Sequence, residues 1–99
     1  MYSYELRQSL EKMFFKLAKR DPKQLSIIEK KIAEVVQNPN HYKNLRTPLQ
    51  HLKRVHIDGC FVLLFSVDED HKIVIFEEYD HHDNIYEWLS GGFRRLLSV

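Results

Sequence analysis

Apolar residues at helical spacing predict two consecutive helices in the first half of the chain. The first helix is expected to begin at Ser9, a good N-cap residue, and to carry an apolar stripe formed by Leu10, Met13, Phe14 and Leu17. The second is expected to begin at Asp21-Pro22 and to stop at Asn38-Pro39-Asn40. Its stripe consists of Leu25, Ile28, Ile32 and Val35. We expect both stripes to lie in the core.

The pattern changes to that of β-strands before and after this helical pair. Residues 2–7 and 52–57 alternate between apolar and polar side chains, whereas residues 60–67 are apolar on both faces, which is typical of a central strand. Asp58-Gly59 predicts a hairpin turn before this central strand. A second turn at Asp68-Glu69-Asp70 leads to a last strand, residues 73–76.

A polar, histidine-rich turn is expected after Phe76, followed by a short helix. Asp80 or Asp83 can cap this helix, and Gly91-Gly92 can end it. Its apolar residues are Ile85, Trp88 and Leu89. The predicted order is therefore β-α-α-β-β-β-α, an α+β fold in which two helices cover one face of an antiparallel meander.

Length and composition indicate a single globular domain that spans residues 1–99, of which 43% are hydrophobic. The first 20 residues do not resemble a signal peptide, and no apolar run is long enough to span a bilayer. The single cysteine, Cys60, excludes an internal disulfide and fits a reducing cytoplasm. We therefore expect a cytoplasmic protein without a membrane partner.

Charge is distributed unevenly although the formal net charge is only +1. Residues 35–57 contain no acidic side chain, whereas residues 68–87 contain eight acids and a single lysine. The basic stretch could face phosphates or an acidic protein partner, or it could simply be a solvated surface.

The candidate chemistry involves histidines near the ends of two predicted strands. Arg54 and His56 share one face of their strand because side chains two residues apart point the same way. Cleavage of RNA through its own 2′-hydroxyl needs a base, an acid and a cation, and His56, His82 and Arg54 are residues of these types. Tyr86 could stack on a base. The sequence does not fix the strand order that would bring these residues together.

Other interpretations of the same residues stay open. The histidines could be solvated, and Tyr86 could belong to the core. A metal site is conceivable, but adjacent residues rarely bind one ion together and no helical His-x3-His pair is present, so we expect neither a metal nor another cofactor. The residues that such a site could use are Asp80, His81, His82 and Asp83, with His56 or His71.

Several segments occur along the chain in the order 17–22, 37–39, 42–45, 52–59, 61–65 and 80–86. Together, these segments resemble the RelE/ParE superfamily of type II toxin–antitoxin toxins over roughly Tyr2 to Leu97. The final segment resembles that family's terminal Gly-His-Arg-x-x-(Val/Ile)-Tyr motif. The YafQ-like branch is the most similar, because it carries catalytic histidines at the places of His56 and His82.

The resemblance implies a RelE-like fold and a toxin that cleaves mRNA in the ribosomal A site without a metal, inhibited by a cognate antitoxin. Three positions depart from the family patterns. A catalytic aspartate of the YafQ-like branch falls at Cys60, one of its histidines falls near Leu45, and an arginine of RelE falls at Val62.

On this basis we expect His56, His82, Arg54 and Tyr86 to be catalytic. Two alternatives are a non-enzymatic inhibitor of DNA gyrase, as in the ParE branch, and an inactive homologue that acts as a binding module. The apolar and basic tail, residues 93–97, is expected either to bind the antitoxin or to pack on the core. The residues expected to bind RNA phosphates are Lys43, Arg46, Lys53 and His81.

Overall fold

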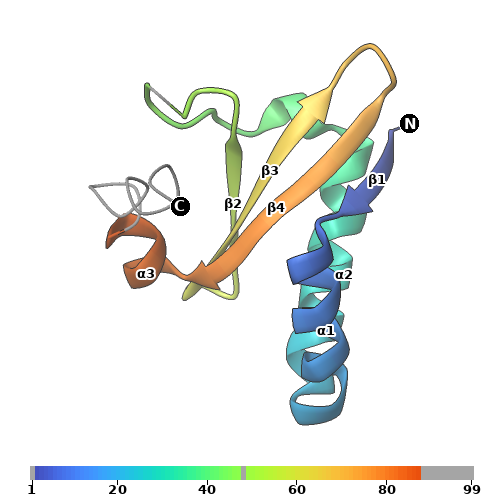
Figure 1. Ribbon diagram of the computed structural model, residues 1–99, viewed down its shortest axis with the longest axis vertical. Coiled ribbons are helices and arrows are strands. Elements are labelled where there is room, and N and C mark those ends of the chain that lie inside the picture. Colours follow the sequence, from blue (N-terminus) through green and yellow to red (C-terminus); the bar gives the residue numbers. More distant parts are fainter. Residues whose placement is uncertain (1, 48, 88–99) are drawn as a thin grey trace.

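The protein has the α+β architecture and the element order predicted from its sequence (Figure 1). The computed structural model describes residues 2–47 and 49–87, with Tyr86 and Glu87 described by their backbone alone. The elements are β1 (Ser3–Leu6), α1 (Gln8–Arg20), α2 (Pro22–Gln37), a 3-10 turn η1 (Pro39–His41), β2 (Lys53–Ile57), β3 (Phe61–Asp68), β4 (Ile73–His81) and α3 (His82–Glu87).

The four strands form one sheet in the order β1-β4-β3-β2. Strands β2, β3 and β4 make the antiparallel meander that the sequence predicts. Its first turn has positive φ angles of 53° at Asp58 and 73° at Gly59, as the Asp-Gly pair predicts for a hairpin. Strand β1 adds in parallel to β4, with Ser3 opposite Ile73. The meander therefore has β4 near the centre of the sheet and β2 at an edge.

Helices α1 and α2 cover one face of the sheet, and α3 lies on the other side of it (Figure 1). The core between the helical pair and the sheet is apolar, because each element presents its buried stripe to it. The fully buried side chains of this core are Leu10 and Ile28 with Val35 from the helices, and Ile57, Leu63, Phe65, Val74 and Phe76 from the sheet.

The two helix starts differ in how well the sequence predicted them. The Asp21 carboxylate accepts a hydrogen bond from the Gln24 amide at 3.1 Å, so the predicted N-cap of α2 is confirmed. The predicted cap at Ser9 is wrong, because α1 begins at Gln8 and its N-cap is Arg7. The Arg7 amide donates to the Phe76 carbonyl at 3.1 Å, so pairing with β4 fixes where the helix starts.

The apolar stripe of α1 is narrower than predicted. Leu10 and Phe14 are buried and Leu17 is half-buried, but Met13 is 37% exposed. Met13 therefore lies at the margin of the stripe.

The predicted turn after Phe76 is also wrong, because β4 continues to His81. A bulge interrupts its pairing with β3: Phe65 lies opposite Phe76, Leu64 lies opposite Glu78, and Glu77 is the extra residue. Because of this extra residue, the side chains of Phe76 and Tyr79 both reach the helix-covered core. After the bulge, the alternation of side chains between the two faces of β4 is therefore shifted by one residue.

Within the residues that the structure describes, no helix combines the length and the apolar character needed to cross a membrane. The expected helix residues Trp88 and Leu89, the expected stop at Gly91-Gly92 and the tail 93–97 lie outside the described residues.

Candidate active site

The sheet face opposite α1 and α2, which we call the open face, brings charged residues from β2 and β4 into two cross-strand rows. His56 lies opposite Val62, and Val62 lies opposite Asp80. In the next row, Arg54 lies opposite Leu64, and Leu64 lies opposite Glu78. Because paired residues share a face, all these side chains belong to the open face.

The centre of the open face is apolar and buried. Val62 and Leu64 are 1% and 0% exposed. Leu45 and Leu52 cover them from the segment before β2, and Ile85 covers them from α3. We call the buried apolar cluster around Val62 and Leu64 the floor of the open face. The charged groups of β2 and β4 lie at its rim, where His56 is exposed and Arg54 is half-buried.

The predicted phosphate-binding residues of the basic stretch lie along the outer edge of β2. Lys43 and Arg46 are exposed in the segment that runs beside this strand, and the Lys43 carbonyl accepts a hydrogen bond from the Arg54 amide at 3.4 Å. Lys53 points to the opposite side of β2 from Arg54, and its ammonium donates to Tyr42 O at 3.0 Å and Asn44 Oδ1 at 2.9 Å. Lys53 thus ties this segment to the strand, whereas Lys43 and Arg46 extend into solvent.

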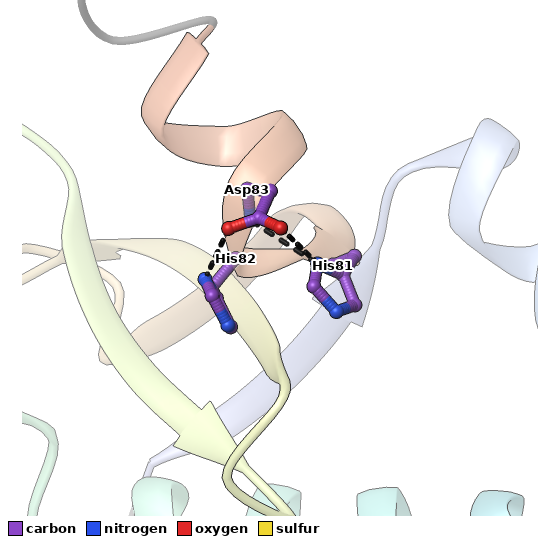
Figure 2. Close-up of side chains that lie close together, drawn as sticks. All are labelled: His81, His82 and Asp83. Atoms are coloured by element: carbon purple, nitrogen blue, oxygen red, sulfur yellow. Dashed lines mark hydrogen bonds and ion pairs between the residues drawn. The ribbon is translucent and has the colours of Figure 1, made fainter.

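The junction between β4 and α3 brings together His81, His82 and Asp83 (Figure 2). Asp83 Oδ1 lies 2.9 Å from His82 Nδ1, and Asp83 Oδ2 lies 3.7 Å from His81 Nδ1. The two imidazole centroids are 4.5 Å apart. The His82 amide donates to the Cys60 carbonyl at 2.8 Å, so this junction lies directly against the β2–β3 turn.

The predicted site residues thus fall into two neighbouring groups. Arg54 and His56 lie on the open face, and His81 and His82 lie at the end of β4. The Cα atoms of His56 and Asp80 are two strand spacings apart, about 10 Å, and His82 follows Asp80 by two residues. The fourth predicted catalytic residue, Tyr86, is in α3, and the structure describes only its backbone.

Sequence reasoning missed the part that Glu78 and Asp80 play on the open face. Both were assigned to a turn region because the bulge hides the alternation of β4. Their signal would have been a strand that continues beyond Phe76, since residues 78 and 80 are then on one face.

Burial raises the pKa of Glu78, which is half-buried on this face. A hydrogen bond from the Tyr79 amide opposes this effect, and the negative charge of Asp80 adds to it, so the pKa of Glu78 lies above its ordinary value. The open face therefore holds a carboxyl group that ionises less readily than usual, across Leu64 from Arg54.

The pKa of Glu77, the bulge residue, is shifted in the opposite direction. Burial alone would raise its pKa, but hydrogen bonds from Arg7 and Ser66 lower it. Coulomb interactions with Arg7 and, more weakly, with His51 act in the same direction, so the pKa of Glu77 lies below its ordinary value. The bonds measure 2.7 Å from Arg7 Nε and 2.7 Å from Ser66 Oγ.

Known proteins resemble this chain in sequence and in structure. No family model matches it. A protein of Methanocaldococcus jannaschii named "Putative toxin RelE4" is 60% identical over 87 residues, which are 88% of this chain and 93% of that protein. An uncharacterized protein of Methanosarcina mazei is 55% identical over 86 residues, 87% of this chain and 100% of that protein.

Solved toxins share the fold. The toxin–antitoxin complex RelBE2 of Mycobacterium tuberculosis superposes with a TM-score of 0.67 at 23% identity, over 81% of this chain and 96% of that one. YafQ of E. coli gives a TM-score of 0.64 at 16% identity, over 87% and 99% of the two chains. The E. coli RelE toxin gives 0.63 at 18% identity, over 82% and 84%. With the sequence relationship to RelE4, these likenesses establish that the chain belongs to the RelE family of toxins.

Proposed function

We propose that this toxin cleaves mRNA on the ribosome, with Arg54, His56 and His82 as its reactive residues. The observation that carries the proposal is the placement of Arg54 and His56 on one exposed face of β2, at the rim of the apolar floor. The exposed cations Lys43 and Arg46 border the same strand. A guanidinium, an imidazole and further cations beside a dry surface suit a phosphodiester.

In the proposed reaction the RNA supplies its own nucleophile. One imidazole takes the proton of the 2′-hydroxyl, the 2′-oxygen bonds to phosphorus, and the bond from phosphorus to the 5′-oxygen breaks. The second imidazole gives a proton to the departing 5′-oxygen, and Arg54 stabilises the charge that develops on the phosphoryl oxygens. The products are a 2′,3′-cyclic phosphate and a 5′-hydroxyl.

Removal of one proton and donation of the other from different sides is compatible with the positions of His56 and His82. They come from different elements on either side of β3, so a phosphate held between them could meet one imidazole from each side. In this proposal Tyr86 stacks on a base, and Lys43, Arg46 and His81 contribute to RNA binding. Lys53 is left out, because its ammonium is bonded to Tyr42 and Asn44 on the other side of β2.

We also infer a cognate antitoxin as the partner of this chain, because the M. tuberculosis RelBE2 toxin is found in complex with its antitoxin. The other proposed partners are mRNA and the ribosome, and both place the reaction in the cytoplasm.

The test is mRNA cleavage in a purified translation reaction, mapped by primer extension with and without ribosomes. We expect ribosome-dependent cuts from the wild type, and a loss of at least about 100-fold in His56→Ala and in His82→Ala. The matched control is His71→Ala, which removes an exposed histidine from the β3–β4 turn. Circular dichroism verifies that each variant is folded.

Cleavage by both variants at the wild-type rate would refute the assignment of the two histidines. One observation favours a non-enzymatic alternative, since the carboxylates of Glu78 and Asp80 make the open face less attractive to RNA. Intact mRNA together with inhibited supercoiling by DNA gyrase would support the ParE-like function. Intact mRNA and active gyrase would support an inactive homologue that binds only its antitoxin.

A further inference from the structure

The start of α3 gathers ligand groups that a continuous strand would separate. In a regular strand, His81 and His82 would point to opposite faces of the sheet. Here the helix begins at His82, and the two rings lie 4.5 Å apart with 31° between their planes. Figure 2 shows the Asp83 carboxylate facing both imidazoles.

Neighbouring residues hold this junction on several sides. The ring of Phe61 contacts the His81 ring edge-on, with 5.6 Å between centroids. The Asp80 carboxylate accepts hydrogen bonds from the His81 amide at 2.7 Å and from Asn84 Nδ2 at 3.0 Å. The His82 amide is bonded to the β2–β3 turn. The backbone that carries the three side chains is therefore fixed by contacts on both sides of the junction.

The donor set and its spacing suit a divalent transition metal ion. One ligand atom from each of His81, His82 and Asp83 lies within 4.8 Å of the other two. Two imidazoles and a carboxylate are ligands that zinc uses at about 2.0–2.2 Å, which places ligand atoms of one tetrahedral ion about 3.4 Å apart. The side chains are 38%, 34% and 76% exposed, so small rotations can close the difference.

We propose that His81, His82 and Asp83 form a zinc-binding site and that the bound ion inhibits the toxin. The inhibitory part rests on the proposed nuclease function: a His82 imidazole that ligates zinc cannot transfer a proton to or from RNA. Zinc is then a regulator of a metal-independent reaction rather than a cofactor.

Binding is tested by calorimetric titration of ZnCl2 into the full chain after treatment with a chelator. We expect one zinc ion per chain, and an affinity at least about tenfold weaker in His81→Ala and in Asp83→Ala. The control is His71→Ala, because His71 Nδ1 also lies 2.9 Å from a carboxylate, that of Asp68, in an exposed turn. This control should bind zinc as the wild type does.

Absence of binding, unchanged binding in both ligand variants, or an equal loss in the His71 control would overturn the site. Inhibition is tested separately by adding ZnCl2 to the cleavage reaction. Wild-type cleavage should fall, whereas the cleavage that Asp83→Ala retains, measured against the rate of this variant without zinc, should be insensitive to zinc. Zinc binding without inhibition would overturn the regulatory role. If the wild type cleaves no mRNA at all, the proposed nuclease function fails, and calorimetry still decides the zinc site.

Discussion

The two faces of the sheet differ in what fills them. The face beneath α1 and α2 is packed with large apolar side chains, and no polar or charged side chain is buried in the described part of the chain. The open face has a small apolar floor around Val62 and Leu64, with charged residues at its rim. Stability thus depends mainly on the face beneath α1 and α2. The open face can therefore carry polar groups whose partial burial costs free energy.

The largest effect on the free energy of unfolding is expected when one buried side chain is removed from each face. Phe65 and Leu64 are adjacent in β3 and both are 0% exposed, but Phe65 points to the helices and Leu64 to the open face. We expect Phe65→Ala to lower the free energy of unfolding by about 3–5 kcal/mol, and Leu64→Ala by about 2–3 kcal/mol, because the smaller cluster can relax around the cavity. Urea denaturation measures both losses, and equal losses would contradict the comparison.

A smaller effect is expected from the ion pair between Arg7 and Glu77. Since the pKa of Glu77 is lowered in the folded state, the pair stabilises the protein above the ordinary value of 4.5 and loses this contribution as pH falls below it. Because Arg7 is 58% exposed, Arg7→Met should cost only about 0.5–1 kcal/mol at pH 7.

Urea denaturation at neutral and at acidic pH measures this difference. The cost of Arg7→Met should shrink toward zero in acid, where both proteins have a neutral Glu77. Glu34→Gln, which removes the exposed pair with Lys31 on α2, is the control. A cost that persists in acid would mean that Arg7 stabilises the fold by packing instead.

The smallest expected effect on the free energy of unfolding is a stabilisation, and it concerns Glu78. Because the pKa of Glu78 is raised in the folded state, ionised Glu78 destabilises the protein above that pKa, and the penalty disappears below the ordinary value of 4.5. Glu78→Gln should therefore stabilise the protein at pH 7 by well under about 1 kcal/mol, since water screens a half-exposed group. In acid the variant and the wild type should be equally stable.

The same urea titrations check this prediction. Glu29→Gln, on the exposed side of α2, controls for the loss of a surface charge. A destabilised Glu78→Gln at pH 7 would show that ionised Glu78 makes a favourable contact, for example with Arg54, and that the open face is better satisfied than we infer.

The sequence predicted the elements whose signals are local. Asp21 and Pro22 supply the N-cap and the first residue of α2, and Asp58 and Gly59 supply the positive φ angles of the β2–β3 turn. Features that depend on distant partners were missed. The start of α1 is fixed by a bond from Arg7 to Phe76, and the length of β4 was hidden by the bulge at Glu77.

The same distinction applies to the candidate site. That Arg54 and His56 share a face follows from strand geometry alone and is confirmed by the register with β3. The neighbours of these residues, Glu78 and Asp80, depend on strand order, which a single sequence does not encode locally. The contact between His81 and His82 depends on α3 starting at the second of them.

The parallel pairing of β1 with β4 also determines when during synthesis the molecule can be completed. Ser3 pairs with Ile73, so β1 has to wait for its partner strand until β4 has been made. Any nascent chain that stops before Ile73 lacks the strand that joins β1 to the meander and that carries Glu78 and Asp80 at the rim of the open face. Products of translation that is interrupted before Ile73 therefore contain no complete sheet.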